Sequence, residues 1–346
     1  FLSFDCLIWN CSQIHYIITL LFQFCLVIAV MTEPYPKIWR HKDENFFQNF
    51  FTGQREKFPS ISDDCSVHIS VVIPAYNEEE RLPPMLDECI EYLENRKKSG
   101  LTYEIIVVSD GSTDSTIVAA ESYSRKYETV RVLGLVKNRG KGGAVRLGLQ
   151  SARGSVVLYA DADGATKFSD IEKLESKFVI VIKFCSIYIE ILISLMLLLV
   201  DYTKDSAKAA LSDAVVCGSR AHLEKEETAK RSIFRTFLMH GFHFLVWLLC
   251  VRGVRDTQCG FKLLTRKTAR TLFNALHVEQ WAFDVEMLFI AQTLRIPITE
   301  IAVNWTEIDG SKVVPIWSWL QMGRDLGLIW LKYRIGAWKI AKLKAD

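Results

Sequence analysis

The sequence predicts an α/β fold built around a mostly parallel β-sheet. Between residues 69 and 160, short apolar runs alternate with amphipathic segments, which is typical of parallel strands joined by crossover helices. A polar cluster directly follows each of the four apolar runs. Because ligands of open parallel sheets bind beyond the carboxyl ends of the strands, we expect these clusters to meet at one site.

The first part of this pattern contains two strands and the helix between them. The first strand covers Ile69–Ile73 and stops at Pro74. A helix is predicted over Arg81–Lys97, since five apolar residues recur there on one helical face. The second strand covers Glu104–Val108, and the turn Ser112–Asp114 is expected to cap the helix that follows.

The pattern then continues toward the middle of the chain. Val130–Val136 forms a third predicted strand, and a glycine-rich turn leads from it into a helix. Ser155–Ala160 is the fourth strand, and Ala214–Ser219 forms another one further along. A later predicted helix, Ile233–Val251, is apolar nearly all round, so it either contacts lipid or lies in the protein core.

Taken singly, the polar clusters have ordinary explanations. Asp110–Asp114 could be a turn with a helix cap, and the turn 137–143 could be an incidental loop, although its basic residues suit an anion-binding nest. Asp161 and Asp163 are more specific, because residues two apart in an extended backbone project to the same side. Two carboxylates so placed suit a divalent cation such as Mg²⁺ or Mn²⁺ that also binds phosphate oxygens.

Composition excludes some classes of function. The net charge is only +2, so nothing indicates a nucleic-acid-binding protein held by bulk electrostatics. The nine cysteines form no C-x-x-C pair and no zinc-ligand spacing, which indicates reduced thiols in a reducing compartment. Half of the residues are hydrophobic, and they gather in a few blocks that indicate membrane contact.

The first apolar block predicts a membrane anchor. Residues 14–31 are nearly all apolar and long enough to cross a bilayer as a helix. A cleaved signal peptide is the alternative, but no suitable cleavage site follows. Residues 1–13 contain no Lys or Arg, whereas Lys37, Arg40 and Lys42 follow the block. We therefore expect residues 1–13 to be lumenal and residues 14–31 to be a signal-anchor. The rest of the chain should be cytosolic and should start with a linker over residues 32–66.

Two later blocks are apolar in different ways. Residues 178–200 would suit a second span, but spanning would put Asp161 and Arg220 on opposite sides of the membrane. We therefore predict an anomalous insert over 178–210 that does not cross. Residues 311–346 interleave tryptophans with cations, which suits an amphipathic helix at the membrane interface, although a core-packed helix is the alternative.

These segments together resemble the family 2 glycosyltransferases, from residue 67 to the C-terminus apart from the insert. Within that family they are similar to enzymes that use a dolichyl phosphate acceptor. The residues that carry the resemblance are 136–143, 160–167, 217–225, 255–262, 281–286 and 303–307. Ser109 and Gln280 depart from the family pattern, which commonly has an acidic residue and an arginine there.

The resemblance implies a GT-A-like nucleotide-sugar domain over 67–310. It implies a single-pass protein of the endoplasmic reticulum membrane with the catalytic domain in the cytosol. The implied reaction transfers glucose from UDP-glucose to dolichyl phosphate with inversion, giving dolichyl β-D-glucosyl phosphate for lipid-linked oligosaccharide assembly and N-glycosylation. The alternatives are a mannosyltransferase that uses GDP-mannose and a catalytically inactive scaffold.

Site residues follow from the resemblance position by position. The expected donor-binding residues are Pro74, Tyr76, Glu78, Asp110, Lys141, Asp161 and Arg220. The first four would hold the uridine and Lys141 the diphosphate, while Asp161 and Asp163 would bind the Mg²⁺ or Mn²⁺.

The acceptor determines what else the site needs. A phosphate oxygen is already anionic, so no strong base is required, but the acceptor charge and the departing diphosphate must be stabilised. Arg231, Arg235 and Lys262 are the candidates for the acceptor phosphate, the alternative for the two arginines being a solvated helix face. Asp284 would orient the acceptor or act as a base, unless it is only a charge favoured at a helix N-terminus.

Overall fold

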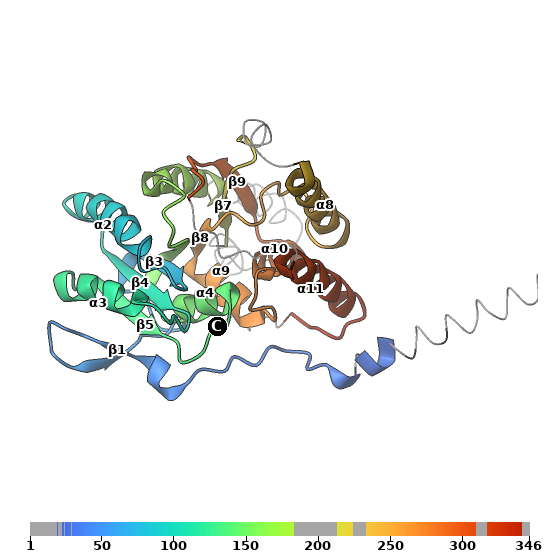
Figure 1. The fold of residues 1–346 in the computed structure, drawn as a ribbon, viewed down its shortest axis with the longest axis horizontal. Coiled ribbons are helices and arrows are strands. Elements are labelled where there is room, and N and C mark those ends of the chain that lie inside the picture. The colour runs from blue at the N-terminus through green and yellow to red at the C-terminus, as the bar shows by residue number, and fades with distance from the viewer. Residues whose placement is uncertain are drawn as a thin grey trace, which may run out of the picture.

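A seven-stranded sheet forms the centre of the molecule (Figure 1). The computed structural model describes residues 19, 23, 25–28, 30–182, 213–223, 233–308 and 317–340, and only the backbone of residues 233–240 and 317. The strands are β3 (Val67–Ala75), β4 (Tyr103–Ser109), β5 (Val130–Gly134), β6 (Gly154–Ala160), β7 (Val215–Ser219), β8 (Phe261–Thr265) and β9 (Ile298–Ala302). Their order in the sheet is β5-β4-β3-β6-β8-β7-β9.

The sheet is mostly parallel, as the sequence predicted. β3 pairs in parallel with β4 and β6, β4 with β5, and β7 with β9. β8 runs antiparallel to both of its neighbours, and the sequence analysis did not identify it as a strand. Because β8 runs in the opposite direction, the loop that precedes it arrives at the same edge of the sheet as the carboxyl ends of the other strands.

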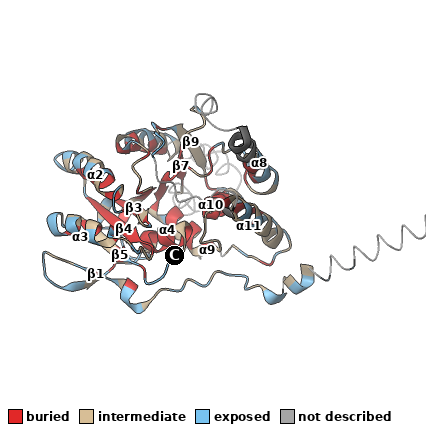
Figure 2. Ribbon diagram, in the orientation of Figure 1, coloured by how far each residue is buried: buried red, intermediate tan, exposed pale blue. Residues whose placement is uncertain are grey.

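Helices cover both faces of the sheet. Successive residues of a strand point to opposite faces, so the fully buried Val71 and Val72 belong to two separate hydrophobic clusters. One face packs against α2 (Leu82–Lys97) and α3 (Thr116–Lys126). The other packs against α4 (Lys141–Gln150), α9 (Arg266–Ala275) and α10 (Phe283–Thr293), and Figure 2 shows how strongly buried residues concentrate in the central strands and α4.

One buried carboxylate joins four strands at the amino ends of the sheet. Glu104, the second residue of β4, is fully buried. Ser70 of β3 donates a hydrogen bond of 2.5 Å to it, while Arg131 of β5 and Arg153, just before β6, lie 3.1 and 3.0 Å away. Two arginines and a hydroxyl satisfy this charge, so the buried carboxylate can stabilise the strands that it joins.

Much of residues 32–66, the segment predicted to be a linker, folds onto the domain. It contains η1 (Lys42–Asn45) and an antiparallel hairpin of β1 (Phe46–Gln48) and β2 (Arg55–Lys57). Phe47, Phe58 and Ile61 are buried in the cluster that also contains Val72. Burial of these apolar side chains stabilises the packing of this segment against the domain.

Two long helices lie side by side beyond the sheet, α8 (Ile233–Leu249) and α11 (Trp317–Arg334) (Figure 1). Leu326 and Ile329 of α11 are fully buried, whereas Leu320 is 61% exposed. The core-packed alternative therefore describes one face of α11. On α8, Phe244 and Trp247 are more than half exposed.

No helix in the described part of the chain is long and apolar enough to cross a membrane. Most of the predicted anchor, which covers residues 14–31, lies outside the described residues, and so do residues 183–210 of the apolar insert. β6 precedes the insert and β7 follows it, yet both belong to one sheet.

Candidate active site

The polar clusters that follow the strands do meet at one edge of the sheet. Parallel pairing of β3, β4, β5 and β6 brings residues 76–78, 110–114, 137–143 and 161–163 to the same side. The loop 251–260 joins them from the opposite direction, through β8.

Asp110 holds the glycine-rich turn in place. Its carboxylate is almost fully buried and accepts hydrogen bonds from the backbone N–H groups of Arg139 (2.7 Å) and Gly140 (2.9 Å). Burial raises the pKa of Asp110 to about 6, even though the two hydrogen bonds favour the ionised form. Gly140 has φ of 85°, which an L side chain rarely adopts, so glycine is required at this turn.

The turn after β3 is fastened to the turn after β4. Asn77 has φ of 54°, and its side-chain oxygen accepts a hydrogen bond of 2.8 Å from the N–H of Thr113. Asp114 accepts a hydrogen bond from the N–H of Thr116 at the start of α3, whereas the N-cap of this helix is Ser115, whose side chain makes no capping hydrogen bond. These contacts fix the two turns that were expected to hold the uridine.

The other expected uridine-binding residues differ in how accessible their side chains are to a ligand. Pro74 is a strand residue of β3 opposite Val108, and Glu78 is buried and paired with Arg81 at 2.6 Å. Tyr76 is 39% exposed, so its ring is the one that a base could stack against.

Asp161 and Lys141 form an ion pair at the end of β6. The Lys141 Nζ lies 2.6 Å from Asp161 Oδ1, and about a third of the Asp161 side chain is exposed. Burial of Lys141 opposes its protonation, but the charges of Asp161 and Asp284 outweigh this effect and raise the pKa of its amine. Lys141 is therefore a cation at neutral pH, beside the position expected for a diphosphate.

Asp161 and Asp163 fit a divalent cation. Burial and the neighbouring charge of Asp161 both raise the pKa of Asp163, as expected where two carboxylates lie close together. No third His, Cys, Asp or Glu joins them among the described residues. Two carboxylates with further oxygens from phosphate and water are the ligands that Mg²⁺ uses in nucleotide sites.

A close backbone contact positions Asp161, and the sequence analysis missed it. The Asp161 N–H donates a hydrogen bond of 3.0 Å to the carbonyl of Gly260. A Cβ at Gly260 would lie 2.0 Å from Asp161 Oδ2, so no other residue fits there without moving the carboxylate. A glycine directly before an apolar strand was the available signal.

Lys262 and Asp284 come together, but inside the protein. The Lys262 Nζ lies 2.6 Å from Asp284 Oδ1, and both side chains are almost fully buried. Lys262 also donates hydrogen bonds to the carbonyls of Thr257 (3.0 Å) and Cys259 (2.7 Å). All three donors of the ammonium are used, so in this arrangement the pair holds the loop 257–260 and does not present free groups to an acceptor.

Arg220 is tied to a second acidic residue. Its guanidinium binds Asp256 bidentately at 2.7 and 2.9 Å and lies 5.4 Å from the ring centroid of Trp305. Burial opposes ionisation of Asp256, but the hydrogen bonds from Arg220 prevail and lower its pKa to about 2. Arg220 thus lies beside the edge where the donor was expected, joined to the loop before β8.

Arg231 lies outside the described residues, and only the backbone of Arg235 is described, in α8.

A residue that the sequence analysis missed is Glu279. Its carboxylate binds Arg139 (2.6 Å) and Arg146 (2.8 Å), which joins the glycine-rich turn to the start of α10. The neighbouring Gln280 donates a hydrogen bond to the carbonyl of Arg139.

Comparison with known proteins decides the family. A model of glycosyl transferase family 2 matches residues 70–179. The dolichyl-phosphate beta-glucosyltransferase of Drosophila melanogaster is 53% identical over 96% of this chain and 97% of its own. The human enzyme of the same name is 55% identical, with 89% of each chain covered. This chain belongs to the dolichyl-phosphate beta-glucosyltransferases.

A less similar relative and a solved structure also match this chain. The Saccharomyces cerevisiae dolichyl-phosphate beta-glucosyltransferase is 41% identical over 80% of this chain and 78% of its own. Among solved structures, glucosyl-3-phosphoglycerate synthase from Mycobacterium tuberculosis in complex with UDP has a TM-score of 0.48 and 19% identity. That match covers 78% of this chain and 81% of the bacterial one.

Proposed function

We propose that this protein transfers glucose from UDP-glucose to dolichyl phosphate, with inversion, to give dolichyl β-D-glucosyl phosphate. Membership of the dolichyl-phosphate beta-glucosyltransferases supports the sugar and the acceptor. The observation that carries the proposal is the ion pair of Lys141 and Asp161 at the end of β6, beside Asp163. Such a combination of cation and carboxylates suits a nucleoside diphosphate.

The donor would lie across the carboxyl ends of β3, β4 and β6. Tyr76 would stack on the base, and Asp110 would keep the turn 138–140 in position. Lys141 starts α4, so both its ammonium and the N-terminal end of the helix would face the diphosphate. Arg220, beside Trp305, would line the sugar side of the pocket.

A divalent cation, Mg²⁺ or Mn²⁺, would be held by Asp161 and Asp163 and would stabilise the charge of the departing UDP. An acceptor phosphate oxygen attacks the anomeric carbon from the face opposite the diphosphate. A bond from this carbon to the acceptor forms as its bond to UDP breaks, so an α-linked donor gives a β-linked product. The anionic oxygen has no proton to lose, which is consistent with the burial of Asp284.

The apolar surface of α8 and α11 would contact the membrane where the acceptor resides. Phe244, Trp247 and Leu248 of α8 and Leu320 of α11 are between 47% and 61% exposed. We further propose that residues 14–31 anchor the protein in the endoplasmic reticulum membrane, with Lys37 and Arg40 on the cytosolic side. Product would then enter lipid-linked oligosaccharide assembly.

The test is sugar transfer in membranes that contain the full chain, supplied with dolichyl phosphate, Mg²⁺ or Mn²⁺, and labelled UDP-glucose or GDP-mannose. We expect label to enter the organic-extractable lipid from UDP-glucose and to be lost in Asp163→Ala. Label from GDP-mannose alone would refute the proposed donor. Absence of label from both donors in the wild-type protein would indicate an inactive scaffold.

A further inference from the structure

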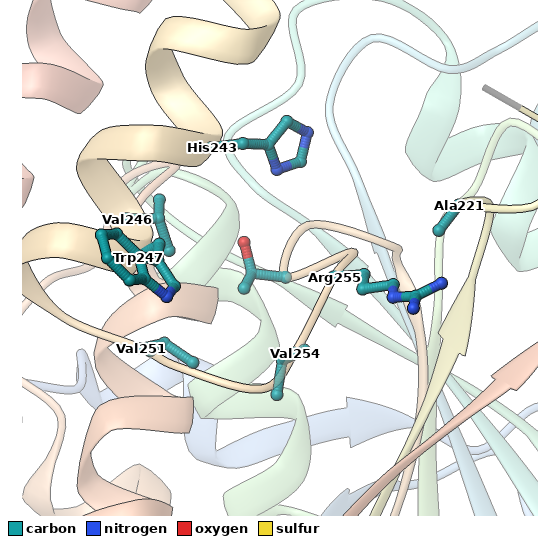
Figure 3. Close-up of a pocket in the computed structure, with 8 residues that line it drawn as sticks. Ala221, His243, Val246, Trp247, Val251, Val254 and Arg255 are labelled. Carbon is teal, nitrogen blue, oxygen red and sulfur yellow. The ribbon is translucent and has the colours of Figure 1, made fainter. Parts of the chain in front are cut away.

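A cavity of about 390 Å³ lies between α8 and the loop before β8 (Figure 3). This volume is within the range of small-ligand sites, about 300–1,000 Å³. Both elements contribute apolar lining residues, namely Val246 and Trp247 from α8 and Val251 and Val254 from the loop. Ala221, directly after Arg220, closes the side nearest β7.

The polar lining of this cavity consists of His243, Arg255 and Thr257, with no acidic residue. Figure 3 shows His243 and Arg255 on different sides of the cavity, one from α8 and the other from the loop. The side chain of Arg255 is exposed. The Glu300 carboxylate accepts a hydrogen bond of 2.9 Å from the backbone N–H of Arg255, but Glu300 does not line the cavity. A cationic side chain in a cavity that is lined by apolar walls and by no carboxylate favours an anionic ligand.

Thr257 supplies an independent sign of a ligand. The residue is only 1% exposed, and its hydroxyl has no hydrogen-bond partner within the described part of the structure. Leaving a buried hydroxyl unpaired is costly, so such a group usually pairs with water or ligand. Here it lines the same cavity as Arg255.

The cavity adjoins the proposed donor site through one loop. Arg255 and Thr257 flank Asp256, which binds Arg220. Three residues further on, the carbonyl of Gly260 accepts a hydrogen bond from Asp161. A ligand phosphate held by Arg255 and Thr257 would therefore lie beside the sugar end of the donor.

We propose that this cavity is the acceptor site, where Arg255, His243 and Thr257 bind the phosphate of the polyprenyl phosphate and the apolar walls bind its first isoprene units. The inference rests on the proposed function and assigns its acceptor to residues for which the sequence analysis proposed no role. The exposed side chains of Phe244 and Leu248 continue from these walls along α8, so the remaining lipid has an apolar path into a bilayer. A soluble anion would not need that path.

Arg255→Gln and Thr257→Val test this assignment, each in the full chain in membranes. The control is Arg125→Gln, which removes the same charge from α3, a helix that packs beside β5 at the far edge of the sheet. We expect the KM for the polyprenyl phosphate to rise at least about tenfold in both cavity variants, as for loss of a charge-assisted hydrogen bond. The KM for UDP-glucose should change less than about twofold, which also reports that the variants are folded.

Competition separates the possible ligands. A short-chain polyprenyl phosphate should inhibit transfer by wild-type protein, and at equal concentration inorganic phosphate and phosphatidic acid vesicles should inhibit much less. Equal inhibition by either of these would overturn the assignment of a polyprenyl phosphate. An unchanged acceptor KM in Arg255→Gln, with normal wild-type transfer, would overturn the cavity as acceptor site. Loss of transfer in wild type as well would refute the proposed function instead.

Discussion

Single residues in this site act mainly by holding loops. Asp110 fixes the glycine-rich turn, Lys262 fixes the loop 257–260, and Gly260 leaves room for Asp161. None of these three residues needs to contact a substrate to affect activity. Their substitution should therefore disturb the position of the groups that do.

Gly260→Ala should abolish most activity while the protein stays folded. The added Cβ would lie 2.0 Å from Asp161 Oδ2, so the carboxylate must move. A displacement of about 1 Å can cost about 100-fold in rate. Transfer assays and thermal unfolding would measure both effects. The control is Gly327→Ala on α11, where a Cβ meets nothing within 4 Å and helix propensity improves. Equal activity of the two variants would contradict the argument.

Acidification should weaken donor binding through Asp110. With a pKa of about 6, its carboxyl is ionised above that pH and protonated below it. A protonated carboxyl cannot accept both amide hydrogens of residues 139 and 140 equally well, so the turn loosens. We expect the KM for UDP-glucose to rise as the pH falls through about 6. In Asp110→Asn it should be raised at every pH, without this step; persistence of the step would assign it to another group.

At the scale of elements, a buried ion pair joins β8 to α10. Lys262 and Asp284 are nearly inaccessible, and Tyr159 of β6 also donates a hydrogen bond to Asp284. Removing one partner leaves the other charged and buried, which costs about 3–5 kcal/mol. Replacing both by apolar side chains costs far less than the sum of the single losses.

Lys262→Met and Asp284→Leu should each lower the free energy of unfolding by about that amount, and the double variant should recover much of the loss. Denaturant unfolding of the three variants beside the wild-type protein would measure the coupling. Additive losses would show that the two side chains do not stabilise the fold as a pair.

For the whole molecule, the strand pattern allowed much of the sheet to be predicted. β3, β4, β5 and β6 lie at or near the predicted positions because their apolar runs are continuous and end in polar residues. β8 was not predicted as a strand, and its antiparallel direction could not have been predicted, since composition does not indicate the direction of a strand. Lys262 was predicted to bind the acceptor phosphate, but its burial and its ion pair with Asp284 could be recognised only in the structure.

The position of β6 and β7 in one sheet leads to a topological prediction. An epitope tag at residue 210, just before β7, should be as accessible to protease in sealed microsomes as a tag at residue 99, after α2. Both segments must lie on the side of the membrane where the sheet folds. Protection of the tag at residue 210 alone, with a detergent-treated control that cleaves both, would contradict a sheet assembled on one side.

The carboxylate of Glu104 implies that the two ends of the sheet open at different rates. Near Glu104, backbone amides of β3, β4 and β6 can exchange their hydrogens with solvent only when four strands separate, which requires nearly global unfolding. At the other end, loops carry most of the contacts, and small local openings suffice. Slow exchange at one end and fast exchange at the other would let the site adjust to successive ligands while the sheet keeps its register.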